Sequence, residues 1–281
     1  MSSSVRYRGG LTAGTRILRA DNGSEVALSE LVQSGERPLV WSLDERKRLV
    51  AKPASDVQSS GRSEVFHVRL ASGRRVEAAA NQAFMTLCGW KLLSELRIDD
   101  RVAVPRRVAV PIRQGRLVDD EVILLAHVIG DGSCVKRQPI RYASIDEQNL
   151  AAVTKAARHF GITAVRDDYA AARVTTLRLP APYRLARGRR NPIAAWLEDL
   201  GLFGLRSYEK FVPTEVFAMP NDQVMLFLRH LWATDGCVWW DAKQGIGRVY
   251  YGSTSRQLIE DVRQLLLRFG ISSRAHATRK T

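Results

Sequence analysis

Cysteine is scarce in this sequence. Its 281 residues include three, Cys88, Cys134 and Cys237, and no two of them have a CxxC spacing. An odd number of widely spaced cysteines argues against a disulfide-stapled scaffold and against a zinc knuckle, and it fits a reducing compartment.

Long apolar runs are absent as well. No run approaches the roughly 18 residues of a membrane-spanning helix, and Met1–Gly10 lacks the apolar stretch of a signal peptide. We therefore expect a soluble, intracellular protein.

Acidic residues are outnumbered: 43 Lys and Arg stand against 29 Asp and Glu, and the formal net charge is +14. This excess points first to nucleic acid, and second to an acidic membrane or to simple solubility. The hydrophobic content of 45% excludes a disordered chain, and the length is sufficient for one large or two medium domains.

The first hundred residues consist of short β-type segments separated by turn residues. The clearest hairpin joins Val65–Leu70 to Arg75–Ala78 through a Ser-Gly turn. Prolines and a Gln-Gly pair follow near residue 113 and indicate a linker. We expect a compact, mostly-β domain at residues 10–112, after a tail at residues 1–9.

Three stretches of this region resemble the Hint domain of inteins, most closely the inteins of replicative helicases. They are Leu11–Thr15, the strand pair Val68–Ala78, and Gly89–Leu96 followed by Asp99–Val102. The splicing positions of that family are replaced here. The nucleophile position falls on Gly10, the Thr-x-x-His element falls on Ala79–Gln82, and no terminal His-Asn pair precedes Thr281. Glycine offers no nucleophile and Gln82 no acid or base, so the resemblance implies a Hint-like scaffold that no longer splices.

The rest of the chain is organised around two apolar helical runs, Leu124–Gly132 and Leu228–Gly236, which each end in Asp-Gly. Residues 119–120 and 221–222 are expected as N-caps and the terminal glycines as helix stops. Two such helices packed side by side would bring their terminal carboxylates together.

The segments after these two helices repeat in the same order. Tyr142–Ser144 and Phe160–Ile162 follow the first helix, and Tyr251–Ser253 and Phe269–Ile271 follow the second. This order predicts a duplicated αββα-type unit with pseudo-two-fold symmetry, with chance likeness of amphipathic helices as the alternative. Repeat one is expected at 118–219 and a shortened repeat two at 220–281, in which the counterparts of 173–210 are missing.

The repeated helix resembles the LAGLIDADG motif of DOD-type homing endonucleases, which has an acid before its final glycine, as Asp131 and Asp235 are placed here. The expected fold is therefore α+β: the mostly-β Hint-like domain, then a LAGLIDADG endonuclease domain at 113–281. The small residues Ala126, Gly130 and Ala233 would allow the two helices to approach closely.

Neighbouring carboxylates repel each other unless a hard cation lies between them. We expect Mg²⁺, with Mn²⁺ as a substitute, at Asp131 and Asp235 together with Gly130 and Thr234, serving phosphodiester hydrolysis. The alternative for each aspartate is a helix-capping carboxylate. Lys210-Phe211-Val212-Pro213 resembles the family's Lys-x-Ile-Pro element. This implies that Lys210 is catalytic, acting on the scissile phosphate or the attacking water; the alternative is a solvated surface lysine.

The strands after each helix are expected to enter the major groove as curved ribbons. Basic and aromatic residues in these strands and in one basic loop are the predicted DNA contacts, and a solvated surface is the alternative for each single arginine. They are Lys136, Arg137, Arg141, Arg173, Arg178, Arg187, Arg189, Arg190, Trp239, Lys243 and Arg248.

These features predict a site-specific, Mg-dependent DNA endonuclease of the LAGLIDADG homing type, fused to a splicing-dead Hint domain. Its catalytic residues would be Asp131, Asp235 and Lys210, and its partner double-stranded DNA in the cytoplasm, at the nucleoid. We expect a monomer with internal pseudo-symmetry; a dimer stays open because repeat two is incomplete. The alternatives are a degenerate remnant that binds DNA without cutting it, and an active splicing element.

Overall fold

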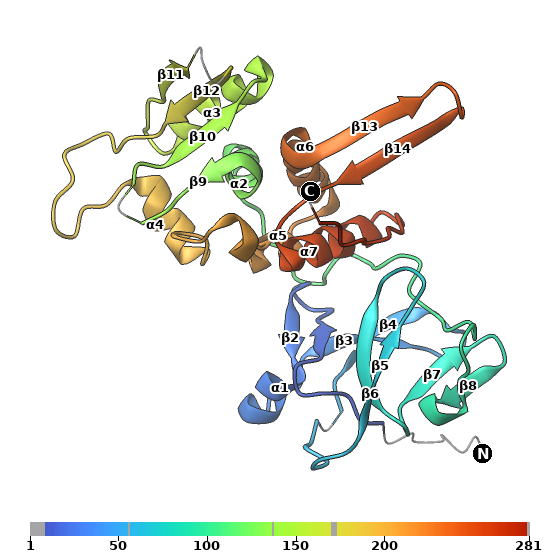
Figure 1. Ribbon diagram of the computed structural model, residues 1–281. Helices are drawn as coiled ribbons and strands as arrows, with labels where there is room; N and C mark the ends of the chain where they lie inside the picture. Colours follow the sequence, from blue (N-terminus) through green and yellow to red (C-terminus); the bar gives the residue numbers. More distant parts are fainter. Residues whose placement is uncertain (1–8, 56, 137, 170–172, 280–281) are drawn as a thin grey trace. The chain divides into compact units, whose positions relative to one another are not determined.

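The computed structural model describes residues 9–55, 57–136, 138–169 and 173–279 (Figure 1). They fall into two compact units, one within Met1–Arg113 and Leu266–Thr281, the other within Gln114–Leu265. Both units mix helices and strands. Of the helices in the described part of the chain, none has the length and apolarity to cross a bilayer.

The first unit is built from short antiparallel hairpins, which confirms its expected mostly-β character. The elements are β1 (Arg16–Leu18), β2 (Glu25–Ala27), α1 (Leu28–Ser34), β3 (Leu39–Leu43), β4 (Leu49–Pro53), β5 (Val65–Arg69), β6 (Arg75–Ala79), β7 (Ala83–Thr86), β8 (Gly89–Leu92) and the 3-10 helix η1 (Leu93–Glu95). The strands pair as β1–β2, β3–β4, β5–β6 and β7–β8. Gly73, at the predicted turn between β5 and β6, has a φ of 83°, which favours glycine.

The segment after the last helix returns to this unit. The backbone N–H of Val108 donates to the carbonyl of Leu267 at 3.2 Å, and Arg107 Nε donates to the carbonyl of Arg268 at 2.9 Å. A Cβ on Gly73 would lie 2.9 Å from the carbonyl oxygen of Ala275. Residues from 266 onward therefore group with the first unit, whereas the predicted boundary placed them in the second domain.

The second unit carries the two Asp-Gly helices. Its elements are α2 (Asp119–Asp131), β9 (Gly132–Ser133), β10 (Arg141–Ser144), α3 (Glu147–His159), β11 (Val165–Tyr169), β12 (Val174–Arg178), α4 (Pro192–Asp199), the 3-10 helix η3 (Ser207–Glu209), α5 (Thr214–Ala218), α6 (Asn221–Asp235), β13 (Gly236–Asp241), β14 (Ile246–Tyr251) and the start of α7 (Arg256–Leu267). The first sheet has the strand order β11-β12-β10-β9, and β13 and β14 form a separate two-stranded hairpin.

The order helix, two strands, helix thus occurs twice, as α2-β9-β10-α3 and as α6-β13-β14-α7. The two sheets differ in extent, because β12 pairs along β10 while the corresponding sheet of the second set, among residues that the structure describes, contains only β13 and β14. In Figure 1 the β13–β14 hairpin projects from the end of α6.

The helix starts differ from the prediction. The N-cap residues are Val118 and Pro220, and the acidic or amide residues follow inside the first turn. At α2 the carboxylate of Glu121 accepts a hydrogen bond from the backbone N–H of Val118 at 3.0 Å. An acid one turn inside the helix therefore satisfies a backbone donor at the helix start, where a side-chain N-cap was expected. Acids in a first turn also interact favourably with the helix dipole.

Each of the two helices ends at a glycine because a side chain there would collide with the preceding turn. Neither glycine has the left-handed conformation that often ends a helix. Gly132 has φ −79° and Gly236 has φ −85°, both extended, so each helix continues directly into a strand. A Cβ on Gly132 would overlap the backbone of Val128, and one on Gly236 would overlap the Trp232 side chain. The predicted helix ends are therefore right in position, and the glycines have an extended conformation there.

Candidate functional site

The ends of α2 and α6 lie together and carry the two predicted acids. The helices pack side by side, and a methyl group on Gly130 would overlap the side chain of Thr234 (Figure 1). Burial raises the pKa of the Asp131 carboxyl, and the Asp235 carboxylate raises it further. The structure thus brings Asp131 and Asp235 close enough to repel each other.

Burial also raises the pKa of Asp235, and the Lys210 ammonium opposes the rise at both acids. Both aspartates are exposed as residues, although their carboxyl groups are partly desolvated. A cation at this place would relieve the repulsion and restore the ionised state of both acids.

A hard cation requires oxygen donors, and the two helix ends offer some. They are the two carboxylates, together with the predicted backbone positions Gly130 and Thr234 at the same helix ends. Among residues whose positions the structure describes, no cluster of three or more His, Cys, Asp or Glu side chains forms a metal site. Two carboxylates fit Mg²⁺, which usually keeps several waters and takes substrate phosphate oxygens as further ligands.

Lys210 is buried, with 4% of its surface exposed, so the alternative of a solvated lysine is wrong. Its ammonium donates to the carbonyls of Val128 at 2.9 Å, Ile129 at 3.0 Å, Gly130 at 3.2 Å and Gly132 at 2.8 Å. Burial lowers the pKa of Lys210, and the neighbouring acids oppose this. The predicted residue is therefore at the site, and its ammonium contacts the end of α2.

The small residues at the helix contact are only partly those expected. Ala126 is fully buried and Gly130 faces Thr234. Ala233 is exposed, and its carbonyl accepts a hydrogen bond from Asn149 Nδ2 at 2.9 Å. The prediction that Ala233 allows close approach is wrong, because α6 turns the neighbouring residue toward α2.

A buried polar chain beside the acids was not predicted. His127 Nδ1 lies 3.0 Å from the hydroxyl of Tyr142, and His127 Nε2 lies 3.0 Å from His230 Nδ1. The chain connects β10, α2 and α6. Each helix carries a histidine about one turn before its terminal acid, four residues before Asp131 and five before Asp235, and their shared presence near the two helix ends is the signal that could have revealed the pair.

The outer face of the first sheet carries two of the predicted DNA contacts. Arg141 and Arg178 are paired in register, while the neighbouring pair, Tyr142 and Leu177, is buried on the helix side. The Arg178 guanidinium forms an ion pair with Asp167 of β11. The basic face is therefore partly neutralised by an acid of its own sheet.

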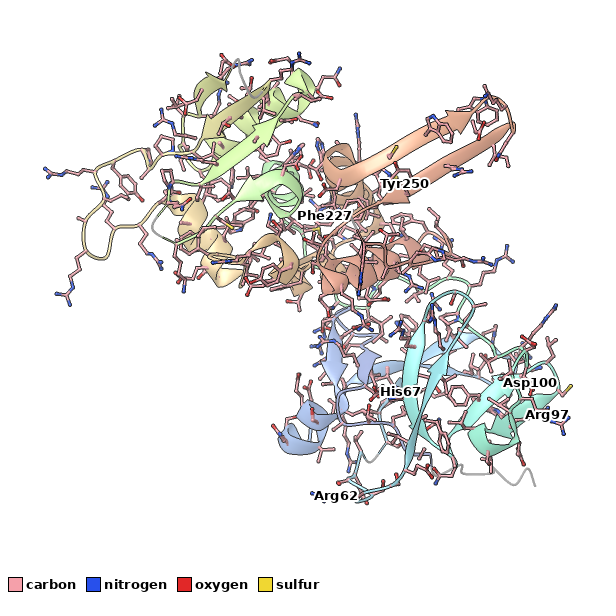
Figure 2. The ribbon with its side chains drawn as sticks, viewed as in Figure 1. Arg62, His67, Arg97, Asp100, Phe227 and Tyr250 are labelled. Atoms are coloured by element: carbon pink, nitrogen blue, oxygen red, sulfur yellow. The ribbon has the colours of Figure 1, made fainter. Side chains whose placement is uncertain are left out.

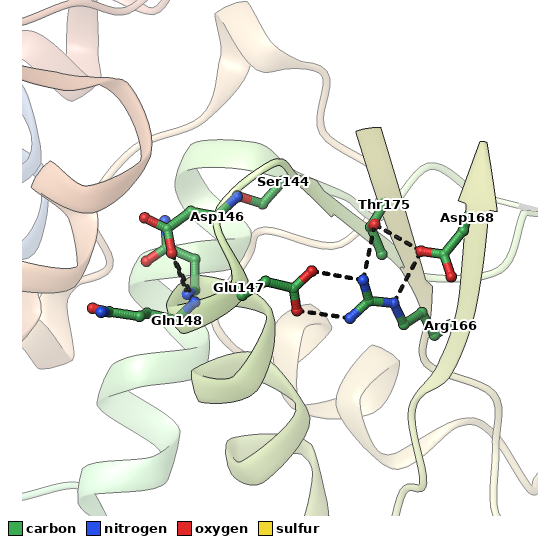
Figure 3. Close-up of polar contacts among 8 residues, drawn as sticks. Ser144, Asp146, Glu147, Gln148, Arg166, Asp168 and Thr175 are labelled. Carbon is green, nitrogen blue, oxygen red and sulfur yellow. Dashed lines mark hydrogen bonds and ion pairs between the residues drawn. The ribbon is translucent and has the colours of Figure 1, made fainter. Parts of the chain in front are cut away.

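The helix side of this sheet has a different polar cluster (Figure 3). Arg166 donates to Glu147 of α3 at 2.6 and 2.8 Å and to Asp168 at 2.9 Å, and Thr175 donates to Asp168 at 2.8 Å. Arg166 thereby joins α3 to the sheet. Arg166 was not a predicted DNA contact, and its ion pairs with Glu147 and Asp168 are consistent with a structural part.

The other predicted contacts of this repeat lie in loops. Lys136 and Arg173 are exposed, Arg173 with a positive φ of 51°, and Arg137 lies outside the described residues. In the basic loop Arg187 is exposed, Arg189 lies over the Tyr183 ring at 3.8 Å, and Arg190 is paired with Glu198. Within this loop Arg189 is therefore held by a ring contact and Arg190 by an ion pair.

The β13–β14 hairpin places side chains of different character on its two faces. Trp239 and Arg248 are register partners, with the guanidinium 5.6 Å from the indole ring, and Tyr250 lies on the same face (Figure 2). The other face carries Val238, Val249 and Trp240, which are 76%, 66% and 63% exposed. Lys243 is exposed in the turn.

The positions on which the resemblance places the splicing residues also lie together, within the first unit. The N–H of Ala79 donates to the carbonyl of Gly10 at 2.8 Å, and the N–H of Gln82 donates to the carbonyl of Ala79 at 2.9 Å. The Gln82 amide donates to the carbonyl of Ala83 at 3.0 Å. The three positions are thus neighbours, and none carries a nucleophile or a titrating group.

The chain is similar to several known proteins. Residues 222–281 match the LAGLIDADG-like domain. Over 98% of its length the chain is 36% identical to the replicative DNA helicase DnaB of Synechocystis sp., of which it covers 32%. Over 94% of its length it is 30% identical to protein RecA of Mycobacterium tuberculosis, of which it covers 33%. The chain therefore spans about a third of the length of these relatives.

Among solved structures, a DnaB intein from Synechocystis sp. is 29% identical, covers 35% of this chain and 70% of its own, and has a TM-score of 0.34. Residues 222–281 thus match the LAGLIDADG-like family, and nearly the whole chain is similar to a segment of the replicative helicase DnaB. The resemblance seen in the sequence is thereby confirmed.

Proposed function

We propose that this chain is a LAGLIDADG-type homing endonuclease that hydrolyses phosphodiester bonds of double-stranded DNA with Mg²⁺. The observation that carries the proposal is the convergence of Asp131 and Asp235 at two packed helix ends, where the carboxyls are partly desolvated and one raises the pKa of the other. Such a pair is suited to a hard cation. The net charge of +14 supports DNA as the partner.

The chain's own residues would each have a defined part. Asp131 and Asp235, with the backbone at Gly130 and Thr234, would hold the ion. When bound, Mg²⁺ supplies polarisation of the phosphate and activation of water. Arg141 and Arg178 would position DNA on the outer sheet face. Lys210 has no direct part on the phosphate in this proposal, because its ammonium is occupied by carbonyl oxygens.

We further propose that the two helix–hairpin–helix sets are a duplicated pair related by a pseudo-two-fold axis. Their shared element order and the shared Asp-Gly ends support this. The segment is similar to parts of proteins as different as a helicase and RecA, which supports an element inserted into different hosts.

Loss of splicing is the second part of the proposal. The resemblance places the nucleophile at Gly10 and the acid or base at Gln82, and both positions lack the chemistry. The Hint-like unit would then serve as a scaffold. Expression between flanking sequences, followed by mass measurement, should show an unprocessed chain; a ligated product would overturn this part.

A DNA-binding remnant without cleavage remains the second candidate. The observation that favours it is the second hairpin, which within the described residues has no counterparts of the strands that β11 and β12 add to the first sheet. An incomplete second reading surface weakens the hold on one half of a long site.

Cleavage of supercoiled plasmids carrying the presumed insertion site decides between the two. We expect nicked or linear product in Mg²⁺ or Mn²⁺, and a loss of at least about 100-fold with Asp131→Asn or Asp235→Asn, since each substitution removes a charge from the cation site. DNA binding, measured in parallel without metal, should be retained by both variants. Binding without cleavage by the unsubstituted chain would favour the remnant, and cleavage unaffected by both substitutions would remove the metal assignment.

A further inference from the structure

A continuous set of contacts leads from the start of α7 to the end of α2. We propose that Lys210 is a positioning residue that fixes the end of α2, and with it Asp131, and that Ser255 and Asp261 hold Lys210 in place. The inference rests on the proposed function only in taking Asp131 as a site residue.

The ammonium of Lys210 has no donor left for a substrate. Its three N–H groups face four carbonyl oxygens at 2.8 to 3.2 Å, those of Val128, Ile129, Gly130 and Gly132. The residue is 4% exposed. Contact with a phosphate would require breaking several charge-assisted hydrogen bonds, each stronger than a neutral one.

The same contacts complete the end of α2. The last carbonyls of a helix have no partner within the helix, and a cation there also interacts favourably with the helix dipole. Lys210 serves three carbonyls of the last turn and one beyond it. Asp131 is the final residue of that turn, so the lysine restricts where its backbone can lie.

The α7 side of the contact set holds the segment that carries Lys210. The Ser255 hydroxyl donates to the carbonyl of Lys210 at 2.5 Å, and Asp261 accepts the N–H of Val212 at 2.9 Å. Ser255 also accepts the N–H of Leu258 at 3.1 Å, and Gln257 donates to Asp261 at 2.8 Å. Ser255 and Asp261 are 1% and 5% exposed, so both contacts are shielded from water.

The end of α6 is held by other donors. Asn149 Nδ2 donates to the carbonyl of Ala233 at 2.9 Å, and the N–H of Gly252 donates to the carbonyl of Asp235 at 3.2 Å. Both are neutral groups, whereas α2 ends on a cation. Asp131 and Asp235 are thus positioned by different hydrogen bonds. The position of Asp131 depends on Lys210, which residues around α7 hold in place.

The test uses the full chain and two readouts that do not need DNA. Asp131 is titrated through its carboxyl carbon by NMR, and hydrogen exchange is measured at the amides of the last turn of α2. The variants are Lys210→Met, which keeps the length of the side chain without its charge, and Ser255→Ala, which leaves the lysine in place. Lys155→Met, on the exposed side of α3, is the matched control.

With Lys210→Met we expect the pKa of Asp131 to rise, because the cation that lowers it is gone, and exchange in the last turn of α2 to accelerate about tenfold or more. Ser255→Ala should change both in the same direction by a smaller factor, and Lys155→Met should change neither. If Lys210→Met does not fold, the Ser255→Ala result alone decides.

An unchanged Asp131 titration and unchanged exchange in the folded variants would overturn the proposal. So would rapid acetylation of Lys210 in the native chain, since a buried, fully bonded amine is protected while exposed lysines react. Absence of plasmid cleavage would count against the endonuclease and would leave these readouts intact, so the two failures are distinguishable.

Discussion

At the scale of single residues, the buried His127 and the half-buried His230 form a titratable pair within the site. Burial, and to a smaller extent the proximity of His230, lower the pKa of His127 to about 4. The pKa of His230 is also lowered, by burial and by Arg229. In the neutral pair one proton lies between His127 Nε2 and His230 Nδ1, and a second proton there would place two N–H donors face to face.

The sign of the pH effect follows from these shifts. His127 binds a proton in the unfolded chain near its usual 6.5 but in the folded chain only near pH 4. Lowering the pH from 6.5 to 4 should therefore reduce the free energy of unfolding of the second unit, by about 3 kcal/mol from this residue. Asp131 and Asp235 act with the opposite sign, since their raised pKa favours the folded state as the pH falls.

Urea unfolding between pH 7.5 and pH 4 measures this dependence. His127→Gln should flatten the profile in that window, because glutamine keeps a hydrogen-bonding group and does not titrate. Tyr142→Phe is the matched control: it removes one hydrogen bond to His127 and leaves the histidine buried, so the slope should persist at lower stability. A profile unchanged by His127→Gln would contradict the assignment.

At the scale of elements, the contact between α2 and α6 depends on one glycine. A methyl group on Gly130 would overlap the Oγ1, Cβ and Cγ2 atoms of Thr234, so the helices must separate or tilt to accept it. Separation would also lengthen the contact between His127 and His230 and move the two acids apart. Overpacking at tight sites typically costs about 1 to 3 kcal/mol.

We therefore expect Gly130→Ala to lower the thermal midpoint of the second unit, although alanine is the better helix former. Gly252→Ala is the control in the same unit, because nothing lies within 4 Å of a Cβ there. Calorimetry on both variants is sufficient. A Gly130→Ala chain as stable as the control would show that the helices are not in the close contact described.

The elements were largely predictable because their signals are local. The Gly73 turn and the two helix ends followed from alternation, turn residues and Asp-Gly punctuation. The caps were missed because Glu121 acts from inside the helix, which composition does not reveal. The contacts of Lys210 and of the histidine pair join residues far apart in sequence, so only the packed unit specifies them.

At the scale of the whole molecule, the excess of basic residues is only partly available to a partner. Arg166, Arg178 and Arg190 are engaged by acids of the chain itself. The exposed arginine of the basic loop, Arg187, is a stronger candidate for phosphate contact than its paired neighbours.

We expect the affinity for a random-sequence DNA duplex to fall steeply with salt, as counterion release requires. Arg187→Gln should reduce the slope of log K against log salt by about 1 and weaken binding equally on different sequences. Lys155→Gln is the control, because α3 packs on the opposite side of the sheet from Arg141 and Arg178. Equal slopes for Arg187→Gln and the unsubstituted chain would remove the loop from the binding surface.

The lysine at the end of α2 also has a consequence for the order of folding. Lys210 and the carbonyl of Val128 are 82 positions apart, and Ser255 lies 45 positions beyond the lysine it holds. Contacts of such separation require closing long loops and form late. During synthesis the apolar body of α2 can be ordered early, while its last turn waits for residues 210 and then 255 to leave the ribosome. The end of α2 that carries Asp131 would be ordered after the rest of the helix.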